Sequence, residues 1–311
     1  LNPNQILLSL TKLFRNKEIV SSKIISDYQN SYQKINNKIN FSNSIEDWIE
    51  IYKTICNWEL KLSDIDELEV SEILMSQKKQ ANKLFSDFIE NNYEYLINNN
   101  DFLSSINLFK TNIVPELSKG HPTLMILIDN LRYDQWKTIE PFVVEDYSIK
   151  KNIIYTSILP TTTQYCRNSI FSGLSPIDIN KFHPNYWVNE TDEGGKNKYE
   201  DELINEQFLR LGIESNYKYH KISNPKDGES FLNRMSNEKQ NELTVMVYNF
   251  VDMISHAKKD VKFIKELASS DRAYRELTKG WFKNSKLNEI IKKGKDLGFK
   301  IIITSDHGTI N

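Results

Sequence analysis

Two adjacent side chains near the end of the chain, Asp306 and His307, can bind a metal ion. They follow the β-branched run 301–304, and Gly308 comes directly after them. Such a run predicts a buried strand, which would deliver a carboxylate and an imidazole side by side at its carboxyl end. This ligand pair suits zinc or a similar divalent ion. Because Asp-His pairs also occur in turns by chance, the pair is weak alone and gains meaning only from its structural context.

Two further predicted strands end in residues with compatible chemistry. The run 124–128 is followed by Asp129, and the run 244–250 is followed by Asp252 and His256. Asp252 and His256 are four residues apart, so one helical turn would place both on the same face, as a metal site requires. Plain alternatives exist for both blocks. Asp129 could cap a helix, and the Asp252–His256 pair could lie on a solvated surface.

A third block combines a predicted strand, a threonine run and a predicted helix. The strand is expected over 153–158, three threonines occupy 161–163, and the helix is expected over 165–171. A helix N-terminus presents backbone N–H groups and a positive dipole end, which suit a phosphate oxyanion. A threonine hydroxyl becomes a useful nucleophile only when a base or a metal activates it. The alternative is that one threonine simply caps the helix.

The order of these elements predicts the fold class. Strands alternate with predicted helices over 201–211 and 286–297, which indicates an α/β fold with a mainly parallel sheet flanked by helices. Ligands of such sheets bind beyond the carboxyl ends of the strands, so the four strand ends are expected to meet. The polar, turn-rich segment 175–240 is expected to contribute a cap-like insertion beside the sheet. We expect the α/β domain to occupy residues 119–311, after an all-α domain over 1–118.

The prediction of an all-α domain rests on apolar stripes at helical spacing and on the absence of strand patterns before residue 118. Such stripes are typical of the seams of a helical bundle. The stripes are Leu7, Leu10, Leu13 and Phe14, then Trp48, Ile51, Tyr52, Ile55 and Trp58, and then Leu74, Ala81, Leu84, Phe85, Phe88 and Ile89, the last in a stretch over about 64–97.

Charge and composition exclude several classes of protein. The 311 residues carry 40 Lys plus Arg and 42 Asp plus Glu, for a net charge of -2, which argues against binding to duplex nucleic acid. The apolar runs are far shorter than the ~20 residues of a membrane span, and no signal peptide is visible. Cys56 and Cys166 do not suggest a disulfide framework. We expect a cytoplasmic protein with no membrane association.

The blocks, taken in this order, resemble those of the alkaline phosphatase superfamily, and most closely its PglZ-domain branch. The segment 159–163, followed by 169–173, is similar to the nucleophile block of the phosphodiesterase members. Together with the helical segment before them, the blocks resemble PorX-type response regulators, which join a receiver domain, a helical bundle and a PglZ domain. The resemblance covers essentially the whole chain. It implies an alkaline-phosphatase-like fold preceded by a helical bundle.

The resemblance also implies an activity, that of a metal-dependent phosphodiesterase or phosphatase serving as the output domain of a two-component response regulator. The nucleophile implied by the match is Thr163, which would attack phosphorus in line and form a phospho-enzyme intermediate. The family holds two metal ions, usually zinc, with other divalent ions as alternatives. Asp252 and His256 would bind metal one. The implied ligands of metal two are Asp129, Thr163, Asp306 and His307.

Three residues near these blocks are candidates for contacting substrate phosphate: Arg167, Asn168 and Arg132. Arg167, one turn past the nucleophile, is the strongest candidate because a guanidinium fork suits phosphate. Arg132 could instead brace Asp129 or form a structural salt bridge. Many phosphodiesterase members carry a phosphate-contacting asparagine where this chain has Cys166. A sulfatase cysteine would need a proline two residues later, where Asn168 stands, so we expect a buried small side chain at Cys166.

Two departures from the family pattern lead to further expectations. The chain ends at Asn311, before the histidine that completes metal one in the family, and no receiver domain precedes the bundle. We therefore expect a fragment whose metal one site lacks a ligand. The implied substrate is a phosphodiester or nucleotide-like compound, and the implied assembly is a homodimer through the receiver or helical region. The alternative is a regulatory dimerisation or ligand-sensing module with little turnover, and a phosphomutase-like transferase is a third hypothesis.

Overall fold

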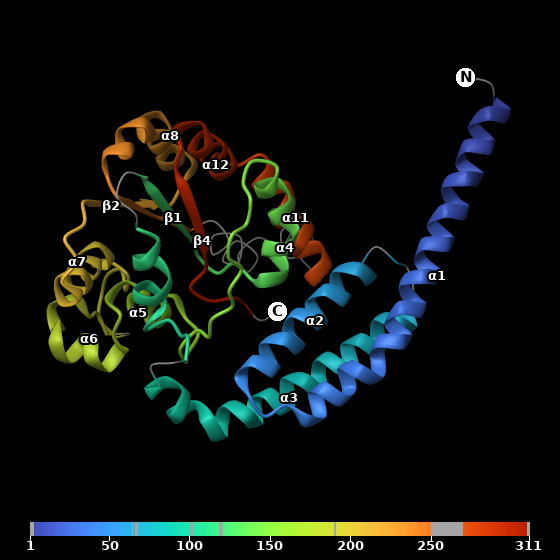
Figure 1. Ribbon diagram of the computed structural model, residues 1–311, viewed down its shortest axis with the longest axis horizontal. Helices are drawn as coiled ribbons and strands as arrows, with labels where there is room; N and C mark the ends of the chain where they lie inside the picture. The colour runs from blue at the N-terminus through green and yellow to red at the C-terminus, as the bar shows by residue number, and fades with distance from the viewer. Residues whose placement is uncertain are drawn as a thin grey trace. The chain divides into compact units, whose positions relative to one another are not determined.

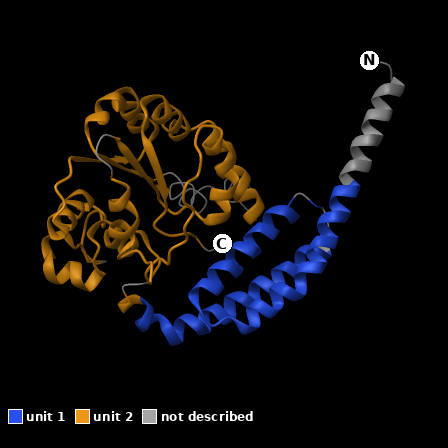
Figure 2. Ribbon diagram, viewed as in Figure 1, with its two compact units in different colours: residues 1–96 blue, residues 97–311 orange. Residues whose placement is uncertain are grey.

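The computed structural model describes residues 3–63, 65, 68–99, 102–117, 121–189, 191–249 and 270–309. The chain divides into two compact units, residues 1–96 and residues 97–311 (Figure 2). This boundary lies earlier than the one expected after residue 118. The reason is that Leu108, Phe109 and Ile113, which precede residue 118, are buried in the core of the second unit.

Three helices build the first unit: α1 (Pro3–Phe41), α2 (Ile45–Leu62) and α3 (Leu68–Asn98) (Figure 1). Helix α2 begins with a capping box, in which the side chains of Ser44 and Asp47 each accept a bond from the other's backbone N–H. No helix in the described part of the chain is long and apolar enough to cross a membrane. These three helices make the first unit all-α, as the apolar stripes predict.

The apolar stripe predicted in α2 is confirmed, because all of its members except Tyr52 are buried. The rings of Trp48 and Phe85 lie 5.5 Å apart between centroids and join α2 to α3. Tyr28 of α1 donates a hydrogen bond of 2.8 Å to the side chain of Gln77 in α3. The stripe predicted over residues 7–14 falls on side chains outside the described ones.

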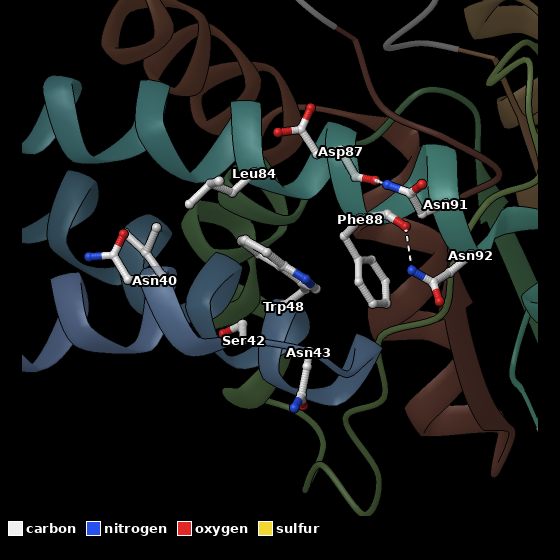
Figure 3. A pocket seen from close by; sticks show the side chains of 10 residues that line it. Asn40, Ser42, Asn43, Trp48, Leu84, Asp87, Phe88, Asn91 and Asn92 are labelled. Carbon is white, nitrogen blue, oxygen red and sulfur yellow. Dashed lines mark hydrogen bonds between the residues drawn. The ribbon is translucent and has the colours of Figure 1, made fainter.

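A pocket of about 440 Å³ lies within this helical unit (Figure 3). The indole of Trp48 lines it, and its Nε1 is buried without a hydrogen-bond partner in the described part of the chain. In Figure 3 the amides of Asn91 and Asn92 turn back onto their own helix, where they donate to the carbonyls of Asp87 and Phe88 at 2.7 and 2.8 Å. The lining contains no Lys, Arg or His, so the pocket offers no cation to a phosphate.

The second unit contains a four-stranded parallel sheet with the strand order β2-β3-β1-β4. Its strands are β1 (Thr123–Ile128), β2 (Tyr217–Ile222), β3 (Leu243–Tyr248) and β4 (Lys300–Thr304). The strands predicted near 124–128, 244–250 and 300–304 are confirmed. Because every pairing is parallel, all four carboxyl ends lie at one edge of the sheet.

The strand predicted over 153–158 is wrong. In the described structure this segment makes one isolated bridge, between Thr156 and Ser104, rather than a strand of the sheet. Its side chains instead support the loop after β4. The hydroxyl of Ser157 donates to the backbone carbonyl of Asp306 at 2.7 Å. The apolar run therefore forms a loop beside the carboxyl edge of the sheet, in which only Ile158 is buried.

The edge position is taken by β2, which lies inside the segment 175–240 where a cap-like insertion was expected. Strand β2 pairs with β3 along its whole length, so this part of the segment belongs to the sheet. The sequence signal for β2 is weak because the strand is polar, and only Ile222 of its six residues is buried. Polar edge strands are common, since their outer side faces solvent.

Alternating side chains of the strands supply two cores, one on each face of the sheet. Leu124, Ile126 and Ile128 of β1 face one core, whereas Met125 and Leu127 face the other. The first core is covered by α4 (Tyr133–Val144), α8 (Pro225–Arg234), α11 (Asp271–Lys283) and α12 (Lys286–Leu297) (Figure 1). The second is covered by α5 (Thr163–Ser172), α6 (Pro176–Phe182) and α7 (Glu200–Leu211). The predicted class, a parallel sheet flanked by helices after a helical region, is confirmed.

Short helical turns complete the second unit. They are η1 (Phe109–Ile113), η2 (Val114–Glu116), η3 (Pro184–Tyr186) and η4 (Met235–Gln240).

Helix α5 ends at Gly173, whose φ of 63° lies in the left-handed region. A Cβ there would also approach the side chain of Gln207 to 3.0 Å. We expect Gly173→Ala to lower the free energy of unfolding by roughly 1–3 kcal/mol, measured by urea denaturation. Gly212→Ala is the matched control, because its φ is 66° and nothing lies within 4 Å of the added Cβ. An equal loss in both variants would show that the contact with Gln207 contributes nothing.

Candidate metal centre and nucleophile

Two buried carboxylates meet at the carboxyl edge of the sheet. Asp129 follows β1 and Asp306 follows β4, and these strands are neighbours in register, with Leu127 opposite Thr304. Asp129 is 1% exposed and Asp306 is fully buried. Burying two carboxylates side by side is costly unless a cation or hydrogen-bond donors compensate their charge.

His307 completes a cluster with these carboxylates. Its Nε2 lies 3.8 Å from Asp129 Oδ1 and 3.6 Å from Asp306 Oδ2. One ligand atom from each of the three residues lies within 4.8 Å of the others, a spacing that fits a single metal ion. Two carboxylates and one imidazole form a donor set suited to zinc and similar divalent ions. The structure thus brings together three of the sequence-predicted ligands from two strand ends.

The hydroxyl of Thr163 lies against this cluster. Thr163 is the first residue of α5, and its Oγ1 lies 3.0 Å from His307 Nε2 and donates to Asp129 Oδ1 at 3.3 Å. The N-cap position of α5 is occupied by Thr162, whose side chain makes no capping bond. The hydroxyl of Thr163 is therefore directed at the carboxylates and the imidazole rather than used to cap its own helix.

One oxygen of Asp306 has no hydrogen-bond partner within the described chain. Oδ1 accepts bonds of 3.0 Å from the backbone N–H groups of Asn130 and His307. Oδ2 is buried and has no hydrogen-bond partner among the described residues. Burial, and then the charge of Asp129, raise the pKa of the Asp306 carboxyl to about 7. An unpartnered buried oxygen beside a second carboxylate fits a bound cation, so the residues present fit a metal.

The backbone at Asn130 helps to form this arrangement. Its φ of 63° is left-handed, a conformation that asparagine tolerates better than most residues. The turn directs the N–H of Asn130 at Asp306, and the next N–H, of Leu131, at the hydroxyl of Ser305 at 2.9 Å. The loops after β1 and β4 are thereby joined by hydrogen bonds at the point where the ligands lie.

The structure gives Arg167 a different place from the predicted phosphate contact. Its guanidinium is buried, and its Nη1 donates to Asp129 Oδ2 at 2.9 Å. Its Nε forms a buried ion pair with Glu200, and Nη1 also donates to the side chain of Asn249 at 3.3 Å. A side chain buried in this way braces Asp129, and its contact with substrate phosphate stays a prediction.

The other two phosphate candidates are also engaged with protein groups. Asn168 is buried, and its amide bonds to the backbone carbonyl of Lys196 and the side chain of Asn197 at 3.2 and 3.0 Å. Arg132 makes a two-bond salt bridge with Asp134, at 2.9 and 2.7 Å, and also pairs with Asp271. For Arg132 the structure thus favours the alternative of a structural salt bridge.

The expectation for Cys166 agrees with its surroundings. Its side chain is fully buried, and its thiol donates to the carbonyl of Ile158 at 3.4 Å. Burial raises the pKa of the thiol to about 12, so it stays protonated. The predicted metal one ligands, Asp252 and His256, lie outside the described residues.

Sequence reasoning missed Glu200, the buried partner of Arg167. An acidic residue in the first turn of a helix is usually explained by the helix dipole, and Glu200 opens α7. Its role depends on α7 packing against α5, which places it beside a residue 33 positions earlier in the chain. Only a search for a buried carboxylate to balance Arg167 could have pointed to it.

Comparison with known families agrees with this geometry. Residues 108–311 match the family described as the BREX system PglZ alkaline phosphatase-like domain. This match covers more than half of the chain, and the chain therefore belongs to the PglZ alkaline phosphatase-like family. Residues 18–97 match the PorX response regulator linker domain, so the chain has the linker-then-PglZ order of a PorX-like response regulator. No curated protein matches the chain.

Proposed function

We propose that this protein is a metal-dependent phosphoric ester hydrolase of the phosphodiesterase type, with Thr163 as its nucleophile. The single observation that supports it best is the position of Thr163 Oγ1, within 3.3 Å of Asp129 and 3.0 Å of His307. A hydroxyl held between candidate metal ligands at a helix N-terminus is what phosphoryl transfer to a protein side chain requires.

Each residue of the cluster has a chemical role in this proposal. Asp129, Asp306 and His307 would hold one divalent ion, for which we propose zinc. When bound, such an ion lowers the pKa of a neighbouring hydroxyl and offsets the negative charge of a phosphate. Asp129 Oδ1 accepts the hydroxyl bond of Thr163 and so orients Oγ1. The start of α5 provides the positive end of the helix dipole to the phosphate oxygens.

The reaction would proceed in two steps. Thr163 Oγ1 attacks phosphorus, forming a new P–O bond while the bond to the leaving alkoxide breaks, and the hydroxyl proton is lost to solvent or to the leaving oxygen. Water then attacks the phosphothreonine, which releases the phosphate product and restores the hydroxyl. The second metal proposed by resemblance would be held by Asp252 and His256. By the same resemblance, we propose a nucleotide-like substrate and a homodimer formed through the receiver or helical region.

Metal dependence tests the proposed activity. Bis(p-nitrophenyl) phosphate hydrolysis by the purified protein should fall at least about 100-fold after treatment with a chelator and return with added zinc. Metal content measured by mass spectrometry should rise and fall together with activity. The monoester p-nitrophenyl phosphate serves as the comparison substrate. A protein that binds zinc and still shows no turnover would contradict the hydrolase proposal and favour the alternative, a regulatory module.

A further inference from the structure

The two carboxylate oxygens of Asp129 have different surroundings. Oδ1 faces the cluster, 3.3 Å from Thr163 Oγ1 and 3.8 Å from His307 Nε2. Oδ2 faces away from it and accepts the bond from Arg167 Nη1 at 2.9 Å. One oxygen is therefore held by the protein, and only the other is directed at the candidate ion.

Arg167 is itself held in place by Glu200. The two side chains form an ion pair through Nε, and they are 2% and 1% exposed. A buried charge is tolerated only when a partner of opposite sign compensates it. Because Glu200 balances the charge of Arg167, the guanidinium can approach Asp129 without adding an uncompensated positive charge next to a metal ion.

Further hydrogen bonds connect Glu200 to the nucleophile. Its Oε2 accepts bonds from the hydroxyl of Tyr219 and from Lys221 Nζ, the latter at 3.2 Å. Lys221 Nζ also donates to the carbonyl of Asn197 at 3.0 Å. The amide of Asn197 donates in turn to the backbone carbonyl of Thr163 at 3.1 Å. The polar contacts thus run from Asp129 through the edge strand β2 and return to the first residue of α5.

We propose that Arg167 and Glu200 are positioning residues that hold Asp129 as a one-oxygen metal ligand, and that Lys221 supports them from β2. A carboxylate fixed through one oxygen binds a metal without first losing rotational freedom, which raises affinity. Loss of Glu200 would leave the charge of Arg167 uncompensated near the ion and would weaken binding by repulsion. This inference rests on the proposed function only in requiring that a metal binds at Asp129.

Zinc affinity measured directly, by competition with a chromophoric chelator, tests the proposal. We expect Glu200→Gln and Arg167→Lys to raise the Kd about 10- to 100-fold, the usual effect of removing a group that orients a ligand. Lys221→Met should raise it less, by about 3-fold, because Lys221 acts one contact further away. The side chain of Lys221 is 33% exposed, so this variant is expected to fold even if the buried variants do not.

The matched control is Arg275→Lys, made in a second buried arginine of the same unit. Arg275 pairs with Asp134 at 3.1 Å and does not contact the cluster. Its replacement should lower the melting temperature of the metal-free protein while leaving zinc affinity unchanged. If Arg167 and Glu200 position Asp129, zinc affinity falls in their variants but not in Arg275→Lys. If their role is merely structural, zinc affinity and stability change together in every variant.

Four outcomes decide the matter. Folded Glu200→Gln and Arg167→Lys proteins with wild-type zinc affinity would overturn the proposal, and so would an equal loss of affinity in Arg275→Lys. Zinc binding by the unaltered protein without hydrolysis would count against the proposed function alone, since the affinities would still test the positioning role. An unaltered protein that binds no zinc would overturn both.

Discussion

Replacing Thr163 by alanine is expected to lower phosphodiester hydrolysis by at least about 10³-fold, because the attacking oxygen is removed. The Oγ1 atom lies between Asp129 and His307, and no other hydroxyl among the described residues bonds to both. The substitution should cost only about 1 kcal/mol of stability, since it removes part-buried hydrogen bonds and creates no large cavity. The loss of activity would thus be chemical rather than a consequence of unfolding.

Steady-state hydrolysis of bis(p-nitrophenyl) phosphate at saturating zinc measures this effect. Thr163→Ser is the matched control, because it keeps the hydroxyl and should retain a substantial part of the rate. The unaltered protein, quenched during turnover, should carry a p-nitrophenyl phosphoryl group on Thr163, because the first step expels only one of the two p-nitrophenolates. Full activity of Thr163→Ala would remove the nucleophile assignment.

Replacing Asp306 by asparagine is expected to have opposite effects on metal binding and on stability. Zinc affinity should fall at least about 100-fold because a charged ligand becomes neutral. The metal-free protein should become more stable, by roughly 4 kcal/mol at pH 8, because the buried charge beside Asp129 is removed. The two backbone bonds to Oδ1 can be retained, since the amide oxygen of asparagine also accepts them.

The gain in stability should depend on pH in a defined direction. Burial raises the pKa of Asp306 from 3.8 to about 7, so between these values the folded protein holds a proton that the unfolded chain has lost. The stability of the unaltered metal-free protein therefore falls as pH rises from about 4 to about 7. Asparagine does not titrate, so the advantage of Asp306→Asn should be small near pH 4 and reach its full size above pH 7.

Urea denaturation of metal-free protein at pH 5 and pH 8 measures this difference. The matched control is Asp134→Asn, which changes a buried carboxylate that already has partners. Asp134 pairs with Arg132 and Arg275, so its replacement should destabilise the protein by leaving those charges uncompensated. A loss of stability in Asp306→Asn at pH 8 would show that the described chain already compensates its charge.

Two of the three strands that the sequence predicted correctly share a clear physical signal, whereas β4 is only partly buried along its length. Strands β1 and β3 are buried along their whole length, and such strands read as continuous apolar runs. The segment 153–158 has a similar composition but forms a loop in which only Ile158 is buried, because an apolar run does not record hydrogen-bond pairing. For β2 the prediction failed in the opposite way. Its polar residues gave no strand signal, yet the segment forms an edge strand that pairs on one side only.

The sequence by itself determined the candidate residues of the metal centre. Asp129, Asp306 and His307 were selected because they follow apolar runs, and Thr163 was selected because the segment 159–163 resembles the nucleophile block of a known family. The tertiary structure alone decided what surrounds them. It placed Arg167 against Asp129, and it supplied Glu200 as the balancing charge. The reason is that charges far apart in sequence become partners only when helix packing buries them together, and no local pattern records that packing.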